Sequence, residues 1–255
     1  MHISDNSLLL SFLTEEKMAT ILNIETSTEV CSVNLAKNGK LLFEKESLEG
    51  LNHSELLTVF IEELFKENHL EMKNIDAVAV AKGPGSYTGL RIGVSVAKGL
   101  CYALEKPLIA ISTLDAIGIF ISQNSEQFNM ESEDPKNLLF CPMIDARRME
   151  VYTALYNSKG EQMEPVSAKI IDENSFSDTL KESKIAFFGN GAAKCAKALN
   201  HSNALFYGPL KASARFMVKL AEKKYNKKEF ENVAYFEPFY LKNFVATVPK
   251  NKIIK

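Results

Sequence analysis

A glycine-rich turn at residues 83–89 is the segment of this sequence best suited to hold a ligand. It reads Gly-Pro-Gly-Ser-Tyr-Thr-Gly and stands between an apolar run and a helical pattern. Glycines allow a backbone to approach a ligand closely, and the free N–H groups at a helix start attract anions. The hydroxyls of Thr26, Ser27 and Thr28 could add donors to a phosphate. The pattern therefore predicts either a nucleotide cleft or a tight strand-to-helix connection inherited from one.

Two acidic residues follow apolar runs in the two halves of the chain. Glu25 ends the run that begins at residue 20, and Asp145 ends the run that begins at residue 138. In an ATP-dependent acyl or phosphoryl transferase, which is the alternative function that we consider, these carboxylates would be the catalytic groups. The expected residues of a nucleotide cleft are Glu25, Thr26, Ser27, Gly83, Gly85, Ser86, Tyr87, Thr88 and Asp145. We expect no firm cofactor, and at most a weak ATP or ADP site.

The sequence lacks the residue patterns of several other kinds of site. There is no Gly-Lys-Ser/Thr of a Walker A loop, and Ser86 does not lie in a Gly-x-Ser-x-Gly elbow. The four histidines contain no pair spaced i, i+4, so we expect no metal site. The four cysteines lie far apart, as expected for small buried apolar residues in a reduced compartment. The sequence therefore shows neither the metal-ligand pattern nor the nucleophile pattern that a peptidase would need.

Alternating and helical patterns place these residues on secondary-structure elements. The first half predicts strands at 20–25, 30–36, 40–48, 75–81 and 107–111, with helices at 52–68, 88–104 and 113–121. The polar residues 122–137 are the best linker candidate. The second half predicts strands at 138–144, 151–156 and 185–188, a Gly loop at 189–193 with a helix after it, and a helix at about 212–228.

The two halves share the order strand, acidic residue, hairpin, helix, strand, Gly loop, helix. Such a duplication predicts an α/β fold with two lobes of the actin/Hsp70 (ASKHA) type, each a mixed sheet carrying helices. We expect residues 1–17 to be an extension, either disordered or a short packed helix, 18–122 to form the N-terminal lobe and 123–255 the C-terminal lobe. No apolar run approaches the ~18 residues of a membrane span, and no signal peptide is recognisable, so we expect a cytoplasmic protein.

Four segments carry a resemblance to a known family. Residues 21–28, 83–93, 145–152 and 237–242 resemble the motifs of TsaB (YeaZ) proteins, and the eleven-residue run at 83–93 is the most specific. Two departures are Glu25, where the family usually has Asp, and Lys242, where Arg is common. The resemblance implies a non-catalytic partner subunit, without activity alone, of the bacterial complex that adds threonylcarbamoyl to adenosine 37 of ANN-reading tRNAs.

The same resemblance implies the partners. They are a TsaD-type ligase in a heterodimer, a TsaE-type ATPase, tRNA through the complex, and a second copy when the ligase is absent; no membrane is involved. The helices at 52–68 and 88–104 would form the partner interface. The expected interface residues are Leu56, Phe60, Leu64, Arg91, Gly93, Ala97 and Cys101. The small residues of the second helix recur every four positions, which also suits close packing on the lobe's own sheet.

Two charged segments have more than one interpretation. The net charge of −2 argues against free-standing nucleic-acid binding by a basic face. The lysines near the end of the helix at 212–228 are better interpreted as a solvated helix terminus than as an RNA-binding patch. Arg147, Arg148 and Glu150 could bridge the lobes, face the cleft, or form a polar hairpin edge.

Overall fold

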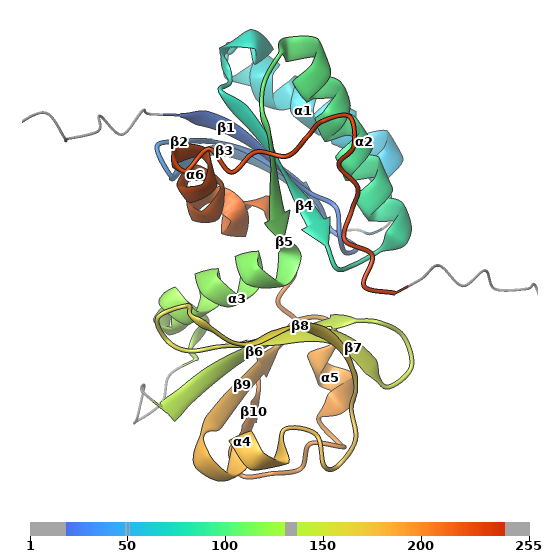
Figure 1. Ribbon diagram of the computed structural model, residues 1–255, viewed down its shortest axis with the longest axis vertical. Coiled ribbons are helices and arrows are strands. Elements are labelled where there is room, and N and C mark those ends of the chain that lie inside the picture. The colour runs from blue at the N-terminus through green and yellow to red at the C-terminus, as the bar shows by residue number, and fades with distance from the viewer. Residues whose placement is uncertain (1–18, 49, 51, 131–136, 243–255) are drawn as a thin grey trace, which may run out of the picture.

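The computed structural model describes residues 19–48, 50, 52–130 and 137–242, and it shows two lobes stacked along the long axis (Figure 1). The expectations for residues 1–17 and for part of the linker lie outside this range. The first lobe contains β1 (Thr20–Glu25), β2 (Cys31–Lys37), β3 (Lys40–Ser47), α1 (His53–Glu67), η1 (Met72–Asn74), β4 (Ala77–Gly83), α2 (Tyr87–Leu104) and β5 (Leu108–Ser112). Its sheet has the order β3-β2-β1-β4-β5. The first three strands are antiparallel, and β4 and β5 continue parallel to β1.

Strand β4 explains why both faces of this sheet are covered. Its run of alternating alanines and valines is buried throughout. Val78 and Val80 pack in a core with α1 and α2, whereas Ala77, Ala79 and Ala81 face a second core on the opposite side. Successive side chains of a strand point to opposite faces, so an all-apolar strand requires two covering layers.

The second lobe has a corresponding sheet. It contains β6 (Leu138–Asp145), β7 (Glu150–Tyr156), β8 (Gln162–Ile170), α4 (Ser177–Glu182), β9 (Lys184–Phe188), α5 (Ala192–Cys195) and β10 (Ala204–Phe206). The order β8-β7-β6-β9-β10 matches β3-β2-β1-β4-β5 strand for strand. The predicted fold of two lobes, each a mixed sheet with helices, is confirmed. The helix after the second Gly loop, α5, has only four residues.

The remaining helices connect the lobes. Helix α3 (Thr113–Gln123), followed by η2 (Ser125–Phe128), leaves the first sheet and packs on β6 and β7. In return, η4 (Ala214–Met217) and α6 (Val218–Asn226) follow the second sheet but pack on the first (Figure 1). These two elements occupy the region where the sequence predicts one helix.

The two sheets therefore share a core. It includes Ile21 and Ile109 of the first sheet, Phe140 and Phe188 of the second, and Ile117 of α3 between them. Among the described residues, no helix is both long and apolar enough to cross a membrane.

Candidate functional site

The turn after β1 buries its acidic residue. Glu25 is 1% exposed, and its Oε1 accepts a hydrogen bond from the backbone N–H of Ser27 at 2.6 Å. Burial raises the pKa of this carboxyl to about 7, although hydrogen bonds from Ser27 and Thr26 oppose the rise. Thr26 and Ser27 are themselves fully buried. Glu25 is thus held within its own turn.

The Gly-rich loop packs directly on this turn. The N–H of Ser86 donates to the Ser27 carbonyl at 2.6 Å, and the Thr26 hydroxyl donates to the Gly89 carbonyl at 2.8 Å. A Cβ at Gly85 would overlap with the Ser27 carbonyl oxygen, and one at Gly89 with that of Thr26. The glycines therefore permit close packing of the β1 turn against the start of α2. This is the tight strand-to-helix connection that the sequence left as one alternative.

The other expected cleft residues of this loop face different neighbours. Ser86 caps α2, because its Oγ accepts the N–H of Gly89 at 3.2 Å. Tyr87 packs against Tyr240, with ring centroids 4.9 Å apart. Thr88 is exposed. The loop thus brings Thr26, Ser27, Gly85 and Ser86 together, whereas Tyr87 and Thr88 point elsewhere.

Asp145 occupies the matching place in the second lobe. Its Oδ1 accepts the N–H of Arg147 at 2.7 Å, as Glu25 accepts that of Ser27, and it forms an ion pair with Lys194 at 2.6 Å. Unlike Glu25, Asp145 is exposed. Within the described part of the chain, no hydrogen bond or ion pair joins it to Glu25. The two strand-end carboxylates therefore correspond in position but not in environment.

Asn190 and Glu29 close the space between the lobes, and sequence reasoning missed both. The side-chain oxygen of Asn190 accepts the N–H of Asp145, and its Nδ2 donates to Glu29 Oε2, both at 2.9 Å. The available signal was the position of Asn190 between Gly189 and Gly191, which places it in the second Gly loop. One hydrogen bond thus links the turn after β1 in the first lobe to the Gly loop after β9 in the second.

The cavity found between the lobes is too small for a nucleotide in this arrangement. The cavity there has a volume of about 10 Å³. It is lined by residues of both lobes, among them Thr28, Glu29, Met143, Ile144, Asn190 and Lys211. That is room for about one water molecule, whereas small-molecule pockets usually measure hundreds of Å³. Access for a larger ligand would require the lobes to move apart.

The expected partner interface divides into buried and surface residues. Leu64, Gly93, Ala97 and Cys101 are buried in the core under α1 and α2. At Gly93, a Cβ would overlap with the hydroxyl of Thr26. The small-residue stripe of α2 therefore faces its own lobe, and these four residues offer no surface to a partner.

The other three interface residues remain accessible. Leu56 and Phe60 of α1 are half-buried, and Arg91 of α2 is exposed. On the same two helices, Val59 is 44% exposed and Tyr102 is 84% exposed. Beside Tyr102 lies an open hollow of about 570 Å³, bounded by α2 and by residues 232–234. Lys98, Gly99 and Tyr102 of α2 line this hollow together with residues 232–234. Sequence reasoning did not select Val59 or Tyr102.

Comparison with known proteins identifies the family. The sequence model of "TsaD: tRNA N6-adenosine threonylcarbamoyltransferase" matches residues 48–250. A tRNA threonylcarbamoyladenosine biosynthesis protein TsaB from Haemophilus influenzae is 29% identical over 89% of this chain and 95% of its own length. TsaB from Bacillus subtilis is 34% identical over 58% of this chain and 59% of its own length.

Solved structures agree with the sequence relatives. YeaZ from Pseudomonas aeruginosa superimposes with a TM-score of 0.68 at 26% identity, covering 88% of this chain and all of that one. A second structure from the same organism, described as an uncharacterized protein with similarity to peptidase YEAZ, has a TM-score of 0.73 at 25% identity and the same coverage. The chain therefore belongs to the TsaD family that this sequence model describes, and within it to the TsaB (YeaZ) family.

Proposed function

We propose that this protein is a non-catalytic subunit of the bacterial machinery that adds threonylcarbamoyl to adenosine 37 of ANN-reading tRNAs. The observation that carries the proposal is the match to nearly the full length of a TsaB protein named for threonylcarbamoyladenosine biosynthesis. The protein acts in the cytoplasm by binding and supporting a TsaD-type ligase. A TsaE-type ATPase completes the assembly, and tRNA is reached through the complex.

The state of the two strand-end carboxylates supports a role without catalysis. Glu25 is buried beneath its turn, and Asp145 is engaged by Lys194 and by its own hairpin. A catalytic base must reach the proton that it removes, directly or through one water. Neither carboxylate is among the residues that line the cavity between the lobes. These features favour the subunit over the ATP-dependent transferase considered above.

The accessible faces of α1 and α2 are the proposed docking surface. Both helices lie on the outer face of the first sheet (Figure 1), and they expose Val59, Arg91 and Tyr102. Exposed aromatic and arginine side chains are the residue types enriched at interface hot spots. We infer that the ligase binds here in a heterodimer and that a second copy of this chain binds here when the ligase is absent.

The test is reconstitution of tRNA modification with each protein omitted in turn. The mixture contains this chain, the TsaD-type and TsaE-type proteins of the same organism, threonylcarbamoyl-adenylate, ATP and tRNA. We expect product only when this chain is present, and none from this chain alone. Equal product without it, or product from it alone, would contradict the proposed function.

Surface variants in a binding assay test the docking surface. Val59→Asp and Tyr102→Ala should each weaken binding of the ligase at least tenfold, measured by calorimetry, because they remove apolar contact area from the interface. Ile170→Asp is the matched control, since Ile170 is 71% exposed at the end of β8 in the other lobe. If Val59→Asp and Tyr102→Ala both fold and both bind the ligase like the wild type, the ligase docks elsewhere.

A further inference from the structure

Residues 236–242 run from α2 toward the second lobe, and we call this segment the strap (Figure 1). At its beginning, Lys98 of α2 donates to the carbonyls of Ala234 and Phe236 at 3.1 and 3.0 Å. Further along, the N–H of Phe239 donates to the carbonyl of Lys82 at 2.7 Å. Several contacts thus fix the strap on the first lobe.

The strap packs on the start of the Gly-rich loop and on Tyr87. The carbonyl oxygen of Phe239 lies 3.1 Å from where a Cβ of Gly83 would be, and the ring of Tyr240 packs on Tyr87 at the start of α2. Gly83 itself is buried. The strap therefore contacts this loop at Gly83 and at Tyr87, whereas Gly85 packs on the β1 turn and Thr88 is exposed.

The end of the strap reaches the second lobe. Lys242 forms an ion pair with Glu150, the first residue of β7. The backbone carbonyl of Glu150 also accepts a hydrogen bond from Lys194, whose ammonium pairs with Asp145. Lys242 is thus joined to the hairpin that carries the second strand-end carboxylate. Sequence analysis left open whether Glu150 bridges the lobes. It does, because it forms an ion pair with Lys242 of the strap, and the strap is held on the first lobe.

Among the described residues, weak polar contacts join the lobes around the cavity. They include the Lys242–Glu150 pair, with side chains 37% and 21% exposed, the hydrogen bond between Asn190 and Glu29, and the hydrogen bond from Lys211 to the carbonyl of Leu48. On the α3 side, by contrast, the two sheets share an apolar core. Opening of the cavity must therefore be a rotation about that core, resisted by the polar contacts.

We propose that the strap is a latch: its Lys242–Glu150 pair holds the lobes closed, and its release opens the cavity between them and exposes Gly83 and Tyr87, which the strap contacts. A partly exposed ion pair changes an equilibrium constant by no more than about fivefold. A latch of this strength is reversible. The inference concerns the motion of the chain itself and does not depend on the proposed function.

Charge exchange in the full-length chain tests the latch. Lys242→Glu and Glu150→Lys each replace attraction by repulsion, and the double variant restores an opposite pair. Lys181→Glu is the matched control, because Lys181 and Asp178 form an exposed ion pair within the second lobe. Circular dichroism verifies that every variant is folded.

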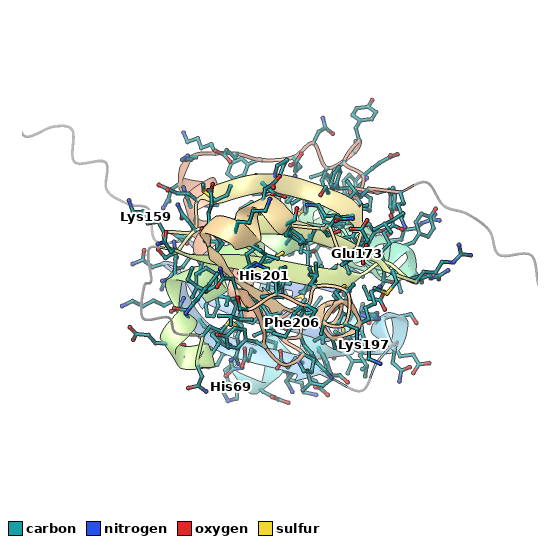
Figure 2. The ribbon with its side chains drawn as sticks, turned by 90° about the horizontal axis from the view of Figure 1, so that it is seen from below. His69, Lys159, Glu173, Lys197, His201 and Phe206 are labelled. Carbon is teal, nitrogen blue, oxygen red and sulfur yellow. The ribbon has the colours of Figure 1, made fainter. Side chains whose placement is uncertain are left out.

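One readout measures the separation of the lobes, and a second measures exposure of the Gly-rich loop. The first is the distance between nitroxide labels at Ser95→Cys on α2 and Lys197→Cys on the second lobe (Figure 2), both exposed positions. The four native cysteines are buried, so labelling is selective for the introduced ones. The second readout is amide hydrogen exchange of residues 82–89.

We expect each single variant to increase the population of longer distances and the exchange rate of residues 82–89, both by about threefold to tenfold. The double variant should return both readouts to the wild-type values, and Lys181→Glu should change neither. Unchanged distances in the folded single variants would overturn the proposal. It would equally be overturned if the double variant failed to restore them, or if exchange rose while the distances did not.

Discussion

Glu25 illustrates how one buried residue sets the properties of the candidate site. Its carboxyl lies out of solvent and is held by backbone N–H groups of its own turn. Burial disfavours the charged form more than these hydrogen bonds favour it, so the pKa rises from 4.5 to about 7. The folded protein therefore retains a proton at this position at pH values where the unfolded chain has lost it.

Glu25→Gln should consequently stabilise the protein at high pH. Between pH 4.5 and 7 the folded state binds more protons than the unfolded state, so this group's contribution to the free energy of unfolding falls as pH rises. The loss approaches 3 kcal/mol, as an order of magnitude, above pH 7. A glutamine keeps an oxygen that accepts the Ser27 N–H and carries no charge. In urea titrations we expect the variant to exceed the wild type by about 1–3 kcal/mol at pH 8.

At pH 4.5 the two proteins should be about equally stable. Glu173→Gln, an exposed position in the second lobe (Figure 2), is the control for loss of a carboxylate as such. A difference between Glu25→Gln and the wild type that is the same at both pH values would show that Glu25 is not the titrating group.

At the scale of the element, helix α2 contains glycines with opposite roles. Gly93 faces the β1 turn, where a Cβ would overlap with Thr26, whereas no atom lies within 4 Å of a Cβ at Gly99. Gly99 is exposed in the interior of an eighteen-residue helix. Alanine is favoured over glycine in a helix by about 0.8–1 kcal/mol when nothing obstructs it. The same substitution should therefore have opposite effects at the two positions.

Thermal and urea unfolding of Gly93→Ala and Gly99→Ala measure this difference. We expect Gly99→Ala to raise the free energy of unfolding by about 0.5–1 kcal/mol. Gly93→Ala should lower it by about 1–3 kcal/mol, because overpacking forces the β1 turn and α2 apart. If both variants are stabilised, α2 does not pack on the β1 turn as closely as described.

The same helix shows what a sequence pattern can and cannot predict. The four-residue period of Gly89, Gly93, Ala97 and Cys101 predicted a face that permits close approach, and that face exists. The pattern could not identify the neighbour, because periodicity describes only one of the two surfaces in contact. Thr26, which fills the space at Gly93, lies more than sixty residues earlier. Val59 and Tyr102 were missed because exposure depends on the complete fold.

At the scale of the whole molecule, each lobe is covered by a helix that follows the other lobe's sheet: α3 packs on the second sheet and α6 on the first. The matching strand orders followed from the repeated pattern in the sequence, since each half contains its own hairpin and Gly loop. The packing of α3 on the second sheet and of α6 on the first did not follow, because a helical pattern does not specify which sheet the helix will cover. This packing creates a core to which both sheets contribute.

A shared core predicts that the lobes unfold together. Ile24 lies in the core between the first sheet and α1 and α2, and Ile185 lies in the core on the outer side of the second sheet. Both side chains are fully buried, and Ile→Val at such positions costs about 0.5–1.5 kcal/mol. If the molecule is one cooperative unit, either substitution lowers the hydrogen-exchange protection of β4 and of β9 by the same free energy. If instead each variant lowers protection only in its own sheet, the lobes unfold separately, and the shared core is too weak to serve as the hinge for the opening proposed above.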